Sequence, residues 1–208
     1  MLGIRHVILV SGLLLSAVAP ASQVSIGIGL PNASIGINLP AYPHLDRVPD
    51  HPVYYAPRLS ANFFFYDGMY WVYQNDNWYA STWYNGPWAL VRPEAVPVFI
   101  LRIPVRYYSL PPPYFRGWRP DAPPRWVERW VERWGRDWER DRSGWDQLDR
   151  SASPPPAPLP LYQRPYSGAR YPRQVEQQHQ LLEQKYRYQP REPVVRQHYQ
   201  ERGQGQGR

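Results

Sequence analysis

Twelve aromatic side chains crowd into the twenty-six residues from Phe63 to Trp88. Three turn signals cut this block: Asp67-Gly68, Asn75-Asp76-Asn77 and Asn85-Gly86-Pro87. The Asp-Gly pair is a two-residue hairpin signal because both turn positions need a positive φ, and Asn, Gly and Pro mark the other turns. The pieces between the turns have the usual length of a strand. The block therefore predicts antiparallel strands near 61–66, 69–74, 78–84 and 88–92.

The second of these strands bears rings on both faces. Successive side chains of a strand point to opposite sides. One face therefore carries Tyr70, Val72 and Gln74, and the other carries Met69, Trp71 and Tyr73. One face must pack inward, and the other is either covered or left exposed. We expect a mainly β fold, a small antiparallel meander or partly open barrel, in an aromatic region over 61–120.

The first 21 residues have the order of a secretory signal peptide. Arg5 and His6 form a basic start, a short apolar run extends from Val7 to Val18, and Ala19-Pro20-Ala21 supplies an A-x-A cleavage site. A membrane anchor is the competing interpretation, but the run is shorter than the roughly 20 residues that a spanning helix needs. We expect a periplasmic or secreted protein without a transmembrane span after cleavage. Export also argues against nucleic acid as a partner.

Residues 22–60 combine a repeat with a linker. The segments Ser25–Pro31 and Ser34–Pro40 repeat one pattern in which apolar residues alternate with small ones. Period two indicates strands, and we interpret the repeat as a hairpin that covers the main sheet. A self-pairing, amyloid-like segment is the alternative, which the density of Pro and Gly disfavours. Residues 41–58 contain four Pro and predict an extended linker.

The residues after the aromatic block are rich in Pro. Pro93–Pro97 predicts one short helical turn, and Pro111–Pro113 predicts a stiff polyproline spacer. Between them, the apolar segment Val98–Tyr108 contains Pro104. Because Pro104 prevents a regular helix, we expect an edge strand over Val98–Tyr108.

A Trp-rich charged helix is predicted within 121–150. Trp recurs every fourth residue, at Trp126, Trp130, Trp134 and Trp138. A step of four residues advances about 400° around a helix, so the four rings form one slowly winding stripe. Acidic and basic residues between them nearly cancel, as on a solvated face. We expect this Trp stripe to lie partly buried against the sheet.

Residues 151–208 read as a disordered basic tail. They are rich in Pro and Gln, and they hold nine Arg and Lys against four Glu, in a chain whose formal charge is +7. Such a composition cannot supply a packed core of its own. One local exception is 174–187, where Val175, His179, Leu182 and Tyr186 recur at helical spacing and predict a marginal helix.

Catalytic and metal-binding motifs are missing from the sequence. It has no cysteine, no G-x-S-x-G, no H-E-x-x-H and no glycine-rich phosphate loop. The linker residues His44 and His51 have no second ligand at a metal-binding spacing. Asp67 and Asp76 are accounted for by turn chemistry. We therefore expect a non-enzymatic protein without a cofactor or bound metal.

Four segments carry a resemblance to a known family: FYDGMYWVYQNDNWYASTWYNGPW, PPPYFRGWRPDAPPRW, GRDWERDRSGWDQLDR and YRYQPREPVVRQHYQ. Through them the chain resembles short exported, Trp/Tyr/Pro-rich proteobacterial proteins of unknown function, over most of its length after residue 21. The resemblance implies a location in the envelope, and it supplies no activity or catalytic residues to carry over. Val127 and Val131 stand where the family often has glycine, which makes the predicted helix more apolar.

The surplus of rings suggests a binding role. Trp and Tyr stack on the apolar faces of sugars, and a sheet of about four strands cannot hide so many rings on one face. The candidate binding residues are Tyr70, Trp71, Tyr73, Trp78, Tyr79, Trp83 and Trp88. We expect them to bind a cell-wall or surface polysaccharide, such as peptidoglycan or an anionic polymer. The alternatives are a structural protein with an envelope protein partner, or a peripheral membrane protein.

Overall fold

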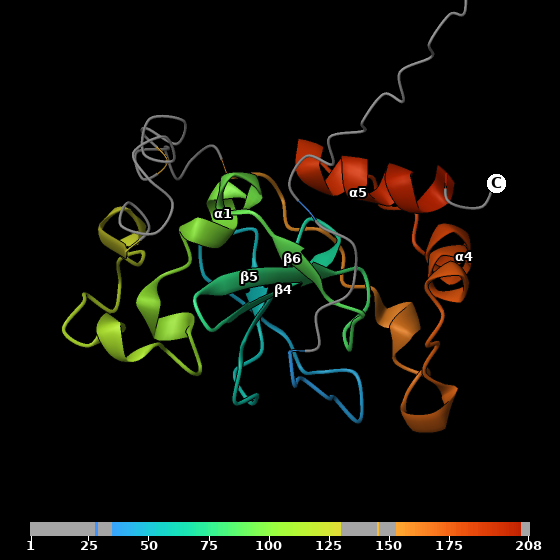
Figure 1. Ribbon diagram of the computed structural model, residues 1–208, viewed down its shortest axis with the longest axis horizontal. Coiled ribbons are helices and arrows are strands. Elements are labelled where there is room, and N and C mark those ends of the chain that lie inside the picture. Colours follow the sequence, from blue (N-terminus) through green and yellow to red (C-terminus); the bar gives the residue numbers. More distant parts are fainter. Residues whose placement is uncertain (1–27, 29–34, 130–144, 146–152, 205–208) are drawn as a thin grey trace, which may run out of the picture.

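The computed structural model describes residues 28, 35–129, 145 and 153–204. For residues 201–204 it describes the backbone alone. The described residues form one antiparallel sheet whose strand order follows the sequence, β1-β2-β3-β4-β5-β6 (Figure 1). The strands are β1 (Asp46–Arg47), β2 (Tyr54–Tyr55), β3 (Asn62–Tyr66), β4 (Met69–Gln74), β5 (Asn77–Ser81) and β6 (Ala89–Val91). The sheet is open, and the predicted mainly β meander is confirmed.

Two tight turns set the register of the central strands. Asp67 and Gly68 have φ angles of 51° and 87°, and Tyr66 pairs with Met69 across them. Asn75 and Asp76 have φ angles of 50° and 59°, and Gln74 pairs with Asn77. Positive φ at both central residues is the geometry that lets a two-residue turn follow the twist of its strands. The turns predicted at these two places are confirmed.

Two very short strands lie in the segment predicted as a linker. β1 pairs with β2, and β2 pairs with β3 through Tyr54 and Phe65, so the sheet is two strands wider than the aromatic block alone. Each strand has two residues, which is too short for a period-two pattern to be seen in the sequence.

Both faces of the sheet are buried in a core of their own. On one face Met69, Trp71 and Tyr73 pack in a cluster with Ile100 and Trp126. On the other face the cluster contains Tyr70 and Val72 with Phe63, Ala56 and Ile35. The two sets of β4 side chains predicted from period two are confirmed, and of the two possibilities left open for the second face, it is the covered one that holds.

The first face is covered by four short helical turns, two of which lie where we predicted an edge strand. They are η1 (Pro93–Ala95), α1 (Val98–Leu101), η2 (Val105–Tyr107) and η3 (Pro113–Phe115). The strand predicted over Val98–Tyr108 is wrong. Pro97 and Pro104 each precede a helical turn, a position where the missing N–H costs nothing, and the turn between them directs Ile100 and Leu101 into the core. The helical turn predicted at Pro93–Pro97 is confirmed.

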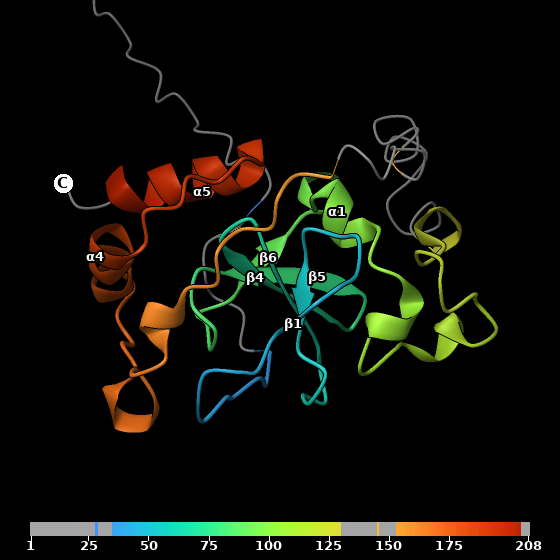
Figure 2. The ribbon, with the colours of Figure 1, turned by 180° about the vertical axis from the view of Figure 1, so that it is seen from behind.

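The C-terminal segment is packed, and the disorder predicted from residue 151 is wrong for 153–204. It forms η5 (Leu161–Gln163), η6 (Gly168–Arg170), α4 (Val175–Lys185) and α5 (Pro193–Gln204) along one side of the sheet (Figures 1 and 2). The physical reason is that its side chains complete the core of the sheet. Gln163 is fully buried, accepts a hydrogen bond from the Tyr70 hydroxyl and donates to the Thr82 carbonyl. The helix predicted at 174–187 is confirmed as α4.

Several expectations fall partly or wholly outside the described residues. The signal peptide, Trp130, Trp134 and Trp138 lie outside them. Residues 126–129 are helical, and Trp126 is fully buried, with its indole N–H donating to the Leu101 carbonyl at 2.8 Å. The hairpin predicted for the repeat is not formed by its second copy, since residues 35–40 contain no strand. None of the helices in the described part of the chain is long and apolar enough to cross a bilayer.

Candidate functional site

The rings predicted to bind ligand on the outer face of the sheet are inside the protein. Six of the seven are at most 4% exposed: Tyr70, Trp71, Tyr73, Trp78, Trp83 and Trp88. The seventh, Tyr79, is half-buried. They cannot form an exposed stacking platform, because chain segments before and after the meander cover both faces of the sheet. The prediction of surface binding through these rings is therefore corrected to core packing.

A pocket of about 580 Å³ lies beside the β4–β5 turn, and we call it the turn pocket. One wall is the end of β4 and the turn, and the other is the segment from Leu110 to Tyr114. Its described lining residues are Asn62, Tyr73, Gln74, Asn75, Asp76, Leu110, Pro111, Pro112, Pro113, Tyr114 and Arg129. Tyr73 is the one member of the predicted ring set that borders it.

The Leu110–Tyr114 wall is fixed to the sheet through Asn62. The buried amide of Asn62 donates to the Leu110 carbonyl at 2.7 Å and to the Tyr73 carbonyl at 3.1 Å, and its oxygen accepts from the Leu110 N–H at 2.9 Å. The three prolines that follow restrict the backbone, and Pro112 has the polyproline angles φ −56° and ψ 151°. The wall is thus a stiff apolar shelf held at one end by a side chain of β3.

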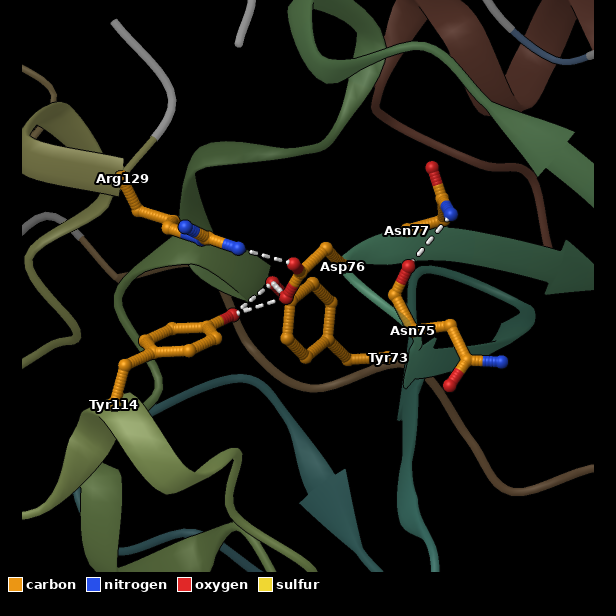
Figure 3. Close-up of polar contacts among 6 residues, drawn as sticks. All are labelled: Tyr73, Asn75, Asp76, Asn77, Tyr114 and Arg129. Carbon is orange, nitrogen blue, oxygen red and sulfur yellow. Dashed lines mark hydrogen bonds and ion pairs between the residues drawn. The ribbon is translucent and has the colours of Figure 1, made fainter. Parts of the chain in front are cut away.

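Asp76 organises the polar side of the turn pocket, as Figure 3 shows. Its carboxylate accepts hydrogen bonds from the Tyr114 hydroxyl at 2.6 Å and from Arg129 Nη2 at 2.6 Å, with a longer contact to the Tyr73 hydroxyl at 3.4 Å. The two tyrosine oxygens lie 2.6 Å apart, and the Arg129 guanidinium lies 4.8 Å from the centre of the Tyr114 ring. Four side chains from three parts of the chain therefore hold one another in place.

Electrostatics fix the protonation states of this network. Partial burial by itself raises the pKa of the Asp76 carboxyl, but hydrogen bonds from Tyr114 and Arg129 and the charge of Arg129 outweigh it and lower the pKa below its usual value. Burial, followed by the hydrogen bond to Asp76, raises the pKa of Tyr114. At neutral pH the network consists of a carboxylate, a guanidinium and neutral phenols. The charges carried by the described lining residues therefore cancel.

The arrangement suits binding better than proton transfer. Asp76 and Arg129 are engaged with each other, and no group in the network has a pKa displaced toward neutrality. The pocket also presents an apolar surface, because the Leu110 side chain on the shelf is 59% exposed. In the described part of the chain no three His, Cys, Asp or Glu side chains gather as metal ligands.

Sequence reasoning did not find this site. Asp76 was fully explained as a turn residue, and neither Tyr114 nor Arg129 stood out. The partners are 38 and 53 residues from Asp76 in the chain, so no local pattern joins them. The one local sequence feature that belongs to the site is the Pro111–Pro113 spacer, which lines the pocket.

The fold and the site define a class of protein. It is an open six-stranded meander with both faces covered, which carries a charge-balanced, tyrosine-lined pocket at one turn. Comparison with protein-family models, with curated protein sequences and with solved structures found no match.

Proposed function

We propose that this protein is an exported, non-enzymatic envelope protein that binds an uncharged stretch of a cell-wall or surface polysaccharide in the turn pocket. One observation carries the proposal. The exposed Leu110 shelf faces a fixed network of hydroxyl, carboxylate and guanidinium groups whose charges cancel. The binding residues thus differ from the buried rings that the sequence suggested, while the class of ligand is the same.

The chemistry of a sugar ring matches a pocket with one apolar and one polar side. Its C–H faces are apolar and its rim carries hydroxyl groups, so it gains from an apolar shelf and from polar groups that are already oriented. The volume of the turn pocket lies within the range of about 300–1,000 Å³ that is usual for small-ligand sites. Pre-oriented groups lose little conformational entropy on binding, which favours affinity.

Export is supported by the sequence alone. The basic start, apolar run and A-x-A site of residues 1–21 have the order of a signal peptide, and the family that the chain resembles has the same organisation. A polysaccharide of the envelope is then a partner that the protein can reach. Analysis of the N-terminal residue of the native protein tests this part: a chain beginning near Ser22 supports export, and an intact Met1 in a cytoplasmic fraction contradicts it.

The test of binding compares two exposed leucines. Leu110→Ser removes the apolar surface of the shelf, and Leu161→Ser makes the same change at a residue that is 47% exposed and does not line the turn pocket. Retention on purified peptidoglycan and on isolated surface polysaccharide is measured by pull-down, and affinity for soluble neutral fragments by calorimetry. Leu110→Ser is expected to weaken binding about fivefold, a loss of about 1 kcal/mol of apolar burial, and Leu161→Ser to leave it unchanged.

A second variant tests the polar side. Asn75 is exposed and has a φ of 50°, so Asn75→Gly keeps the turn and removes only the amide. A reduced affinity with an unchanged melting temperature supports the proposal. If no polysaccharide is retained, or if Leu110→Ser and Asn75→Gly bind like the parent, the proposal fails and a structural role with a protein partner becomes the better hypothesis.

A further inference from the structure

A second pocket, of about 510 Å³, lies in the C-terminal segment between η6 and α4. We call it the Tyr-Arg pocket. Its described lining residues are Pro165, Tyr166, Ala169, Arg170, Tyr171, Pro172 and Gln177. Figures 1 and 2 place this segment, in orange, at the opposite end of the molecule from the green-yellow segment that contains Tyr114. The two pockets therefore share no residue and lie apart.

The walls of the Tyr-Arg pocket are anchored to the body of the protein. The Tyr171 hydroxyl donates to the Gly86 carbonyl at 2.5 Å and accepts from the Asn85 N–H at 3.2 Å. The Tyr166 carbonyl accepts from the Tyr84 hydroxyl at 2.5 Å. Both tyrosines are thus tied to the loop that joins β5 to β6, Tyr171 through its ring hydroxyl and Tyr166 through its backbone carbonyl.

Buried groups behind these walls make them rigid. The fully buried Trp83 meets the rings of Tyr166 and Tyr171 edge-on, with centroids 5.6 and 5.7 Å away. The buried Gln178 amide donates to the Pro172 carbonyl at 2.8 Å and to the Gly86 carbonyl at 3.0 Å. Buried groups thus hold Tyr166, Tyr171 and Pro172, so this side of the pocket is formed before any ligand binds.

Charge distinguishes the Tyr-Arg pocket from the turn pocket. Arg170 is exposed, and it is the one described lining residue that is charged at neutral pH. It forms no ion pair with an acidic side chain in the described part of the chain. The pocket thus offers an uncompensated guanidinium, which suits the planar, bidentate geometry of a carboxylate. Tyr and Pro walls next to it offer a surface for a ring.

From this combination we propose that the Tyr-Arg pocket binds a carboxylate-bearing sugar ring, such as the uronic acid unit of an acidic polysaccharide. Arg170 pairs with the carboxylate, and the tyrosine and proline walls pack against the ring. This site is independent of the turn pocket and goes beyond the function proposed for it. The two together would let one protein contact neutral and acidic stretches of a polymer.

The probe is an oligogalacturonate tetramer, compared with the same tetramer after methyl esterification of its carboxylates. Binding to the full-length mature chain is followed by calorimetry and by amide shifts of 165–177. Arg170→Gln is expected to weaken binding of the acid at least about tenfold, the loss of a charge-assisted hydrogen bond, and to leave binding of the ester unchanged. Arg170→Lys is expected to have an intermediate effect, because the charge stays and the bidentate geometry is lost.

The matched control is Arg173→Gln, which makes the same change of charge three residues away at an exposed position that does not line the pocket. It is expected to bind like the parent. Equal losses in both variants would show attraction to the general positive charge and would overturn the proposal, as would equal affinity of the parent for acid and ester. Leu110→Ser is expected to keep acid binding, so failure of the turn pocket and failure of this site are told apart.

Discussion

Gly68 is the residue on which the hairpin turn and the C-terminal segment meet. Its φ is 87°, and a Cβ at this position would lie 2.8 Å from the Tyr199 hydroxyl oxygen, which itself donates to the Gly68 carbonyl at 2.6 Å. A side chain here would therefore strain the backbone and push the Tyr199 hydroxyl away. The absence of a side chain is needed for both reasons.

Gly68→Ala and Gly117→Ala separate these two costs. Gly117 has nearly the same φ, 85°, and a Cβ there would meet nothing within 4 Å. Gly117→Ala is expected to cost about 1–2 kcal/mol of backbone strain, and Gly68→Ala about 1 kcal/mol more because it also breaks the Tyr199 hydrogen bond. Denaturant unfolding of both variants measures the difference. Equal losses of stability in the two variants would mean that Tyr199 is not hydrogen-bonded to this turn in solution.

Asp76 illustrates why the residues of the turn pocket were not predictable. An Asn-Asp pair at a hairpin turn is fully accounted for by its positive φ angles, so nothing in the local pattern indicates a second role. That role depends on Tyr114 and Arg129, which approach only because the sheet and the proline shelf are folded. The Tyr-Arg pocket was missed for the same reason, since Tyr171 is held by a loop 85 residues earlier in the chain.

At the scale of elements, one carboxylate of the β3–β4 turn holds the segment that leads into α5. Asp67 is buried and accepts hydrogen bonds from the backbone N–H groups of Arg191 and Glu192, just before the helix, and from the Tyr188 hydroxyl. Backbone N–H groups at the start of a helix have no partner within it, so an acceptor there stabilises the helix. A turn residue thereby fixes an element that begins 126 residues later in the chain.

Asp67→Asn is expected to loosen α5 selectively. Asn tolerates the positive φ but presents an N–H₂ group to donors, which leaves buried donors unpaired at a cost of about 2–3 kcal/mol. Hydrogen exchange should accelerate in 193–204 much more than in β4. Asp50→Asn is the control, because Asp50 has a φ of 60° and is exposed. Unchanged exchange in α5 after Asp67→Asn would contradict this attachment.

Elements were predictable where the signal was local. Strands β3 to β6 follow from turns and alternation within a few residues, and α4 follows from spacing at 174–187. The strand predicted over Val98–Tyr108 is wrong because Pro104 was interpreted as a strand feature, whereas Pro97 and Pro104 each precede a helical turn. The two-residue strands β1 and β2 carry no pattern at all and exist because β3 offers an edge to pair with.

At the scale of the whole molecule, composition misled the prediction for the C-terminal segment. A segment rich in Pro, Gln and Tyr cannot build a core, but it does not need to when another part of the chain supplies one. The Tyr70 hydroxyl and the Tyr84 N–H both donate hydrogen bonds to the buried Gln163 side chain, and the Trp83 indole donates to the Gln178 carbonyl. The sheet has more rings than it can cover by itself, and the C-terminal segment covers part of them.

This mutual dependence predicts the behaviour of a shortened chain. Truncation after Ala152 exposes Trp83 and Tyr84 and leaves the Tyr70 hydroxyl without its buried acceptor. Each polar group that loses its partner in this way costs about 1–3 kcal/mol of stability. The total stability of a typical domain is only about 5–15 kcal/mol. The truncated chain is therefore expected to lose near-UV circular dichroism and to bind a hydrophobic dye. Adding residues 153–208 as a separate peptide should restore the native signal. A truncated chain that keeps the melting temperature of the parent would instead support a loosely attached tail, as the composition suggested.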